Sequence, residues 1–194
     1  MSGSFDILIV GIGGQGTILA SNILGEACLI EDRHVMGAET HGMAQRGGSV
    51  ESHIRIGGEF GPLITPGQAD LLISFDLLEA LRYSHYLKPG AKMVVNNHLV
   101  LPTSVYTQKL SPPSEAEIIA ALNKHHLCLL DADSLAAEAG SPLSANVVML
   151  GAASSVMPLK PESLLEAVRR LVPKKTVEIN VNAFESGRKA GGTF

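Results

Sequence analysis

A glycine-rich turn near the N-terminus limits the folds open to this chain more than any other feature. The apolar run FDILIV at Phe5–Val10 is short and contains β-branched residues, which is typical of a strand buried on both faces. The turn GIGGQG at Gly11–Gly16 follows directly. Beyond it, apolar residues recur at helical spacing, at Leu19, Ile23, Ala27 and Ile30. A strand, a tight turn and a helix in this order predict an α/β fold.

The second half of the chain repeats the order of strand followed by helix. Short apolar runs predict strands over 70–74, 91–96 and 126–130. Capping-box spacing predicts that helices begin after Asp76, with Glu79, and after Ser114, with Glu117. Further helices are predicted over 145–156, from Pro161 with the apolar stripe Leu164, Leu165, Val168 and Leu171, and from about Lys175 to near Gly187. We therefore predict a three-layer α/β/α sandwich with a mostly parallel, Rossmann-like sheet.

Between these halves the sequence predicts a loop and an antiparallel hairpin insertion. Residues 36–48 lack periodicity and are rich in glycine, which predicts a long, shaped loop. Residues 49–56 (SVESHIRI) alternate, with Val50 and Ile54 on one face and His53 on the other, as in a half-solvated antiparallel strand. Gly57-Gly58 then predicts a hairpin turn into a strand over 60–64.

Composition fits one domain, which we place at residues 1–188, followed by a flexible tail at 189–194. Hydrophobic residues make up 45% of the 194 residues, so a sizeable core is expected. The net charge of −4 argues against a nucleic-acid surface. No apolar run reaches the roughly 18 residues of a membrane span, and the N-terminus lacks the basic region of a signal peptide. We expect a cytoplasmic protein.

The glycine turn has the spacing G-x-G-x-x-G at Gly11, Gly13 and Gly16, which lets a ligand approach the backbone at a helix N-terminus. A dinucleotide site also needs an acidic residue after the second strand, whereas Glu31 and Asp32 precede the apolar piece at 34–36. No Lys-Ser/Thr pair follows Gly16, which excludes a P-loop. A dinucleotide or flavin site and a tight turn shaped for packing or for a partner both remain open.

A second candidate is Arg46, which is followed by Gly47 and Gly48. Its guanidinium fits a phosphate or a carboxylate, or alternatively pairs with Glu39 to hold the loop. The histidines show no ligand spacing, so no metal site is predicted. Asp131 and Asp133 fit helix capping at the end of a strand.

The only two cysteines, Cys28 and Cys128, lie in apolar stretches and are expected to be buried. They are too few for an iron–sulfur cluster, which usually takes four thiolates.

Four segments together resemble the γ-type domain of the 2-oxoacid:ferredoxin oxidoreductases. They are GIGGQGTILAS, GAETHGMAQRGGSVESHIRIG, SANVVMLGA and INVNAFESG. The resemblance spans Asp6 to Gly187, and the wording ETHGMAQRGGSV is most similar to the indolepyruvate branch.

The resemblance implies a small subunit that is inactive without a large subunit carrying thiamine diphosphate and [4Fe–4S] clusters. The implied reaction is oxidative decarboxylation of an aryl pyruvate such as indolepyruvate, in amino-acid catabolism, with electrons passing to ferredoxin and the acyl group to coenzyme A. No Gly-Asp-Gly precedes Asn96-Asn97, so this chain lacks a thiamine diphosphate motif of its own. An apolar partner-facing surface would favour homodimers of the isolated chain.

The same resemblance implies that the glycine-rich loops face the partner or coenzyme A. The candidate surface comprises Gly11, Gly13, Gly14, Gln15, Gly16, Thr17, Arg46, Gly47 and Gly48. No catalytic acid or base and no metal ligand is assigned in this chain, and Asn146 and Asn180 are expected to make structural hydrogen bonds. The alternatives are a γ subunit of the pyruvate or 2-oxoglutarate type, a stand-alone NAD- or flavin-binding domain, and a scaffold that binds nothing small.

Overall fold

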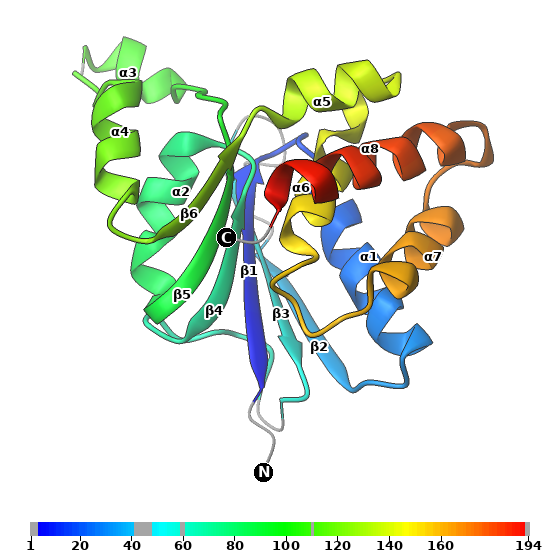
Figure 1. Ribbon diagram of the computed structural model, residues 1–194. Helices are drawn as coiled ribbons and strands as arrows, with labels where there is room; N and C mark the ends of the chain where they lie inside the picture. Colours follow the sequence, from blue (N-terminus) through cyan, green and yellow to red (C-terminus); the bar gives the residue numbers. More distant parts are fainter. Residues whose placement is uncertain (1–3, 41–47, 59–60, 110, 193–194) are drawn as a thin grey trace.

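The computed structural model describes residues 4–40, 48–58, 61–109 and 111–192, and these form one six-stranded sheet with helices on both faces (Figure 1). The strand order is β2-β3-β1-β4-β5-β6. The strands are β1 (Phe5–Ile12), β2 (Val35–Thr40), β3 (Ser49–Ile56), β4 (Ala69–Ser74), β5 (Leu87–Asn96) and β6 (His126–Leu130). The three-layer α/β/α sandwich predicted from the sequence is confirmed.

The sheet has a parallel part and an antiparallel part that meet at β1. Strand β1 pairs in parallel with β4, β4 with β5, and β5 with β6. On its other side β1 pairs antiparallel with β3, and β3 pairs antiparallel with β2. The helices that follow β1 and β4 pack on opposite faces of the sheet, and α/β proteins usually bind ligands at the carboxyl ends of strands where this switch occurs.

The antiparallel hairpin exists, but it is formed by β2 and β3 rather than by β3 and residues 60–64. Residues 36–40 were predicted as loop, and they form a strand because β3 pairs with them from Val35↔Ile56 to Thr40↔Glu51. The strand was not predicted because Gly37 and Ala38 are residue types that are uncommon in strands. Of the predicted strand at 60–64, the described residues 61–64 are not a strand, and the N–H of Ile64 donates to Nδ1 of His53 (3.1 Å).

That contact also corrects the prediction of a half-solvated β3. His53 is only 2% exposed, and its ring packs edge-on against Tyr86 at 5.9 Å. Arg55, on the same face, pairs with the buried Asp6 of β1 (3.1 Å). The polar side chains of β3 therefore find their partners inside the molecule, because residues 61–64 and Tyr86 cover this face.

The helices divide the core into two clusters, one on each face of the sheet. The larger cluster lies under α1 (Thr17–Ile30), α5 (Ala132–Ala139), α6 (Ala145–Ala153), α7 (Pro161–Leu171) and α8 (Val177–Gly191). The smaller lies under α2 (Leu77–Tyr83) and α4 (Glu115–Leu122), while α3 (Thr103–Thr107) is a single turn before α4. Short 3₁₀ turns lie at Ser84–Tyr86, Pro142–Ser144 and Lys174–Thr176. No helix in the described ranges is long and apolar enough to cross a membrane.

Most helix starts agree with the sequence. Asp76 accepts hydrogen bonds from the N–H groups of Leu78 and Glu79, and Ser114 with Glu117 forms a complete capping box. The last helix, however, continues past the predicted end near Gly187 to Gly191, which is buried. Residues 189–191 are thus helical rather than part of the predicted tail, and 193–194 lie outside the described residues.

Glycines let α6 and α8 touch backbone to backbone. A Cβ atom on Gly187 would lie 1.9 Å from the carbonyl oxygen of Val148, and one on Gly151 would lie 2.0 Å from that of Phe184. Gly191 meets Ala152 in the same way, at 2.5 Å. The motifs SANVVMLGA and INVNAFESG therefore supply a close helix–helix contact in the core.

Candidate functional site

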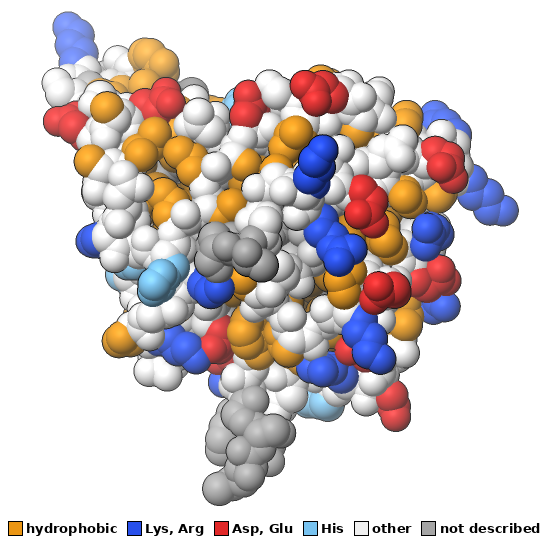
Figure 2. Space-filling model, in the orientation of Figure 1, with side chains coloured by type: hydrophobic (Ala, Val, Ile, Leu, Met, Phe, Trp, Pro, Cys, Tyr) orange, Lys and Arg blue, Asp and Glu red, His pale blue; other side chains and the backbone are white. Residues whose placement is uncertain are grey.

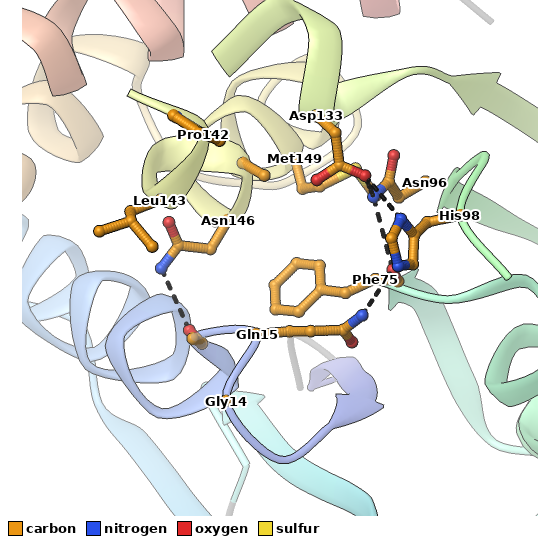
Figure 3. A pocket seen from close by; sticks show the side chains of 12 residues that line it. Gly14, Gln15, Phe75, Asn96, His98, Asp133, Pro142, Leu143, Asn146 and Met149 are labelled. Carbon is orange, nitrogen blue, oxygen red and sulfur yellow. Dashed lines mark hydrogen bonds and ion pairs between the residues drawn. The ribbon is translucent and has the colours of Figure 1, made fainter. Parts of the chain in front are cut away.

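A cavity of about 210 Å³ opens at the carboxyl ends of the parallel strands. The glycine turn after β1 forms one wall, and the starts of α5 and α6 lie opposite (Figure 3). The cavity is lined by Gly14, Gln15, Gly16, Phe75, Asn96, His98, Asp133, Pro142, Leu143, Ala145, Asn146 and Met149. Three of the predicted site residues, Gly14, Gln15 and Gly16, belong to this lining.

The glycine turn adopts a backbone that side chains rarely tolerate. Gly14 has φ +110° and Gly16 has φ +85°, both in the left-handed region. A Cβ on Gly14 would meet no atom within 4 Å, so this residue is open to the outside. A Cβ on Gly16 would lie 2.4 Å from Nδ2 of Asn146. Gly14 therefore presents bare backbone, whereas Gly16 makes room for α6.

Gln15 points back into the turn rather than towards a ligand. Its Oε1 accepts from the N–H of Ile12 (2.7 Å), and its Nε2 donates to the carbonyl of Phe75 (3.4 Å). Gly11 allows this arrangement, since a Cβ there would lie 2.8 Å from Oε1 of Gln15. Gln15 thus ties the end of β1 to the end of β4 and fixes the turn.

The wall opposite the turn carries an amide, an imidazole and a carboxylate. Asn96 is buried at the end of β5, where its Oδ1 accepts from the N–H of Ala132 (2.9 Å) and its Nδ2 donates to Asp133 (3.2 Å). Nδ1 of His98 lies 2.9 Å from the same carboxylate oxygen of Asp133 (Figure 3). His98 and Asp133 are both partly exposed, so this pair faces the cavity and is the polar contact most accessible to a ligand.

The two aspartates after β6, Asp131 and Asp133, have different structural roles. Asp131 caps α5 by accepting from the N–H of Ser134 (2.9 Å), which confirms the capping prediction for that residue. Asp133 does not cap the helix and instead pairs with His98. Sequence reasoning missed His98 because the residue lies in a loop after β5, and only the sheet brings that loop beside the end of β6.

Asn146 and Asn180 make the structural hydrogen bonds expected of them. Nδ2 of Asn146 donates to the carbonyl of Gly16 (3.3 Å), which ties the start of α6 to the glycine turn. Nδ2 of Asn180 donates to the carbonyl of Thr176 (2.8 Å). Leu143 is 90% exposed at the rim beside Asn146, so one side of the cavity mouth is apolar.

A second cavity, of about 350 Å³, lies on the other side of the glycine turn. Gly13, Gly14, Gly16 and Thr17 line it from the turn, and Glu39, Thr40, Glu51 and Ser52 line it from β2 and β3. The N–H of Gly13 donates to the carbonyl of Gly48 (2.8 Å), so the two predicted glycine-rich segments do meet. Arg46 and Gly47 of the predicted surface lie outside the described residues.

The acidic residues considered for a dinucleotide site lie elsewhere. Glu31 follows α1, where it accepts from the N–H of Lys160 (2.7 Å) and pairs with Arg33 (3.2 Å). Since α1 begins at the glycine turn, its C-terminal end points away from both cavities (Figure 1). Glu39 lies near the end of β2 and lines the second cavity, but β3 separates β2 from β1. The sequence predicted Glu39 as a loop residue and an alternative partner of Arg46, and did not predict the strand that carries it.

Two buried carboxylates lie just outside these cavities. Burial raises the pKa of Asp76, which accepts from the N–H groups of Leu78, Glu79 and Val100. Burial also raises the pKa of Glu79, which accepts from Ser49 and pairs with Arg82. Their hydrogen bonds tie α2 to β3 and to the loop after β5, so both are architectural.

Neither cavity is lined by a cysteine. Cys28 and Cys128 are both buried, as predicted, and burial raises the pKa of Cys28 to about 11. Within the described ranges no three His, Cys, Asp or Glu side chains are grouped to hold a metal ion. The arrangement offers exposed backbone and one imidazole–carboxylate pair beside the glycine turn, which suits binding of a polar group.

Comparison with known proteins assigns the family. Residues 6–190 match the family model described as pyruvate ferredoxin/flavodoxin oxidoreductase. The indolepyruvate oxidoreductase subunit IorB of Archaeoglobus fulgidus is 39% identical over 94% of this chain and 92% of its own length. The same subunit of Thermococcus kodakarensis is 38% identical over 96% and 95% of the two chains.

Solved structures share the fold. The γ subunit of a keto/oxoacid ferredoxin oxidoreductase from Geobacter sulfurreducens superimposes with a TM-score of 0.72 at 27% identity, covering 96% of this chain and 98% of that one. A 2-oxoglutarate:ferredoxin oxidoreductase from Magnetococcus marinus, with 2-oxoglutarate, coenzyme A and succinyl-CoA bound, gives 0.73 at 21% identity. This chain covers 31% of that longer one, so the same fold there forms about a third of a single chain. The chain described here therefore belongs to the pyruvate ferredoxin/flavodoxin oxidoreductase family, as the small subunit of a 2-oxoacid:ferredoxin oxidoreductase.

Proposed function

We propose that this chain is the small subunit of an indolepyruvate:ferredoxin oxidoreductase that acts on aryl pyruvates. The supporting observation is a gap in similarity between two branches of the family. Four IorB subunits are 37–39% identical to this chain, whereas four KorC subunits of 2-oxoglutarate synthases are 26–30% identical over a similar length. The chain is thus nearer to the indolepyruvate branch along nearly its whole length.

The redox cofactors belong, in this proposal, to a large partner subunit. Two buried cysteines on α1 and β6 do not provide the four thiolates of a [4Fe–4S] cluster. Thiamine diphosphate and the clusters of the partner would supply the decarboxylation chemistry and carry electrons to ferredoxin. This chain contributes a binding surface and no catalytic acid or base.

The surface around the glycine turn is our candidate for the phosphate groups of coenzyme A. Gly16 is the N-cap of α1 and provides no side-chain hydrogen bond to the first N–H groups of this helix. Uncapped N–H groups and the positive end of the helix dipole favour an anion. Gly14 adds exposed backbone between the two cavities. The imidazole of His98 lies in the same cavity, where it pairs with Asp133.

The first experiment tests the subunit and its branch together. The chain is co-expressed with the large thiamine-diphosphate, iron–sulfur subunit, and the complex is assayed anaerobically for ferredoxin reduction. We expect activity with indolepyruvate and phenylpyruvate, and at least tenfold less with pyruvate and 2-oxoglutarate. Activity on pyruvate or 2-oxoglutarate alone would keep the subunit role but contradict the assignment to the indolepyruvate branch. If the isolated chain binds NAD or flavin and forms no complex, the subunit role is wrong and the chain is a stand-alone NAD- or flavin-binding domain.

A second experiment tests the coenzyme A surface. Gly14→Asp places a carboxylate at the turn, and Gly57→Asp is a matched control because Gly57 also has positive φ (+75°) with no atom near a Cβ. Gly57 follows β3 and lies beside the start of β1, at the opposite end of the strands from the glycine turn. We expect Gly14→Asp to raise the KM for coenzyme A about tenfold or more through charge repulsion, with Gly57→Asp unchanged. Equal KM values for the two variants would remove the turn from the coenzyme A site.

A further inference from the structure

An open groove runs between α1 and the edge strand β2. Its volume is about 610 Å³. The groove is lined by Ser21, Asn22, Gly25, Glu26 and Leu29 of α1, by Val35, Gly37, Ala38 and Glu39 of β2, and by Ile54 and Leu171. We call this the α1–β2 groove. Leu29 and Leu171 are 66% and 39% exposed, so its rim is apolar.

Gly25 is the feature of this groove that the isolated chain does not explain. It lies in the middle of α1, where glycine is less favourable than alanine because it loses more backbone freedom. A Cβ on Gly25 would meet no atom within 4 Å. The helix therefore gains no internal contact from this glycine, in contrast to Gly151 and Gly187 in the core. A segment of another chain that packs closely against the backbone of α1 would explain why this position is glycine.

The backbone of β2 offers a way to bind such a partner. Among the described residues, no strand pairs with the side of β2 that faces away from β3. The N–H of Gly57 donates to the carbonyl of His34 (2.8 Å), and antiparallel pairs alternate, so the peptide groups of Val35 and Gly37 point away from β3. Strand β2 has no lysine and no proline to discourage pairing (VMGAET).

Charge narrows the chemistry of the occupant. The α1–β2 groove contains the carboxylates of Glu26 and Glu39 and no lysine or arginine. Both carboxylates are partnered within the chain: Arg170 reaches Glu26 (2.9 Å), and Ser21 donates to Glu39 (2.7 Å). An occupant that is mainly apolar and carries one basic residue fits this lining, whereas an acidic segment does not.

The geometry points to an extended, mainly apolar segment of the large subunit, with one Lys or Arg, which adds to β2 as a further strand and lies over Gly25. This inference rests on the proposed role as a subunit. A second copy of this chain is disfavoured because two grooves of like charge would face each other. In the longer Magnetococcus marinus chain the same fold is joined to further chain of about twice its length, so this fold does occur with additional protein beside it.

Hydrogen exchange of the complex locates the docking surface. The full-length chain is measured alone and in the co-expressed complex, and the amides of Val35 and Gly37 are followed. We expect at least tenfold slower exchange in the complex. Unchanged exchange at β2 in a stable complex would overturn this inference and leave the proposed function standing. Protection of the β6 side alone would be such a result. Figure 2 shows hydrophobic side chains gathered over α4 and β6 at the upper left, which makes that side the main competitor.

Two pairs of variants test the contact itself. Gly25→Gln fills the α1–β2 groove while Gly25→Ala adds only a methyl group, and neither meets an atom of the chain at its Cβ. Gly37→Pro removes an outward N–H while Gly37→Ala keeps it. We expect Gly25→Gln and Gly37→Pro to leave the complex at least tenfold faster than the wild type, and each alanine control to stay within threefold. Wild-type rates for both test variants would overturn the inference.

Two further outcomes separate this inference from the proposed function. If the wild-type chain forms no complex with the large subunit, the proposed function fails and the inference fails with it. If the isolated chain already shows slow exchange at Val35 and Gly37, rising with concentration, the occupant is a second copy, and the partner segment is excluded.

Discussion

Glycines occupy two regions of this molecule for opposite reasons. Between α6 and α8 they are buried, and a Cβ on Gly151 or Gly187 would lie within about 2.0 Å of a carbonyl oxygen. At the glycine turn and in α1, Gly14 and Gly25 face open space, and a Cβ there would meet nothing within 4 Å. The first pair is explained by packing inside the chain. Packing does not explain the second pair. The positive φ of Gly14 (+110°) favours glycine, whereas Gly25 has no such reason, and our proposals place a ligand or a partner at these two positions.

This comparison also separates the motifs that suggested the family. SANVVMLGA and INVNAFESG serve the α6–α8 contact, so they report on the fold. GIGGQG reports on the fold at Gly11 and Gly16, which make room for Gln15 and Asn146, whereas Gly14 exposes backbone that we propose as part of a binding surface. A motif that suggests a family therefore contains both glycines that neighbouring atoms fill and glycines that face open space, and the structure separates the two kinds.

The largest effect is expected at the buried pair. Gly187→Ala forces a methyl group against the carbonyl of Val148, and α6 and α8 must separate because backbone cannot rotate away. Overpacking of this kind should destabilise the chain by about 3 kcal/mol or more. Thermal or urea unfolding of the purified chain measures this. A variant as stable as the wild type would mean that α6 and α8 do not touch as described.

An intermediate effect is expected at Gly16. Alanine there takes up a left-handed backbone and meets Nδ2 of Asn146, which has a side chain able to move. We expect a loss of about 2 kcal/mol, mostly from backbone strain. Combining Gly16→Ala with Asn146→Ala should cost less than the sum of the two single changes, as a double-mutant cycle of unfolding free energies would reveal.

A smaller effect on stability is expected at Gly14. Gly14→Ala has only the cost of positive φ, about 1 kcal/mol, because nothing lies near the new methyl group. If this surface binds coenzyme A, the KM for coenzyme A should rise while the unfolding midpoint hardly moves. A large loss of stability with an unchanged KM would place Gly14 with the buried glycines and break the comparison.

The last prediction reverses the sign. Gly25→Ala should stabilise the isolated chain by up to about 1 kcal/mol, since alanine is the better helix former and the space is open. Unfolding of the isolated chain is the measurement, with Gly187→Ala as the opposite case. Destabilisation by Gly25→Ala would mean that Gly25 has a contact within the chain after all.

Much of the fold followed from local pattern. Capping residues such as Asp76, Ser114 and Asp131 predicted where helices begin, because a short polar side chain can satisfy the first N–H groups on its own. Buried strands such as β1 and β4 were visible as apolar runs. Strand β2 was not, because its sequence has no alternation and it forms only against β3.

The candidate site was half predictable for a similar reason. The glycine turn could be identified from sequence, since strand, glycines and helix are contiguous. His98 and Asp133 lie 35 positions apart in the chain and meet only because β5 and β6 are neighbours in the sheet. No spacing in the sequence reports such a pair.

The sequence by itself determined the class of fold, most helix starts, the glycine turn and the family resemblance that the comparisons bear out. These are set by interactions within a few residues or by whole-chain similarity. Only the tertiary structure decided which glycines are filled by neighbours, that β2 and β3 form the hairpin, and that His53 is buried. Those outcomes depend on what packs against a residue from distant parts of the chain, and burial is a property of the assembled layers rather than of any segment.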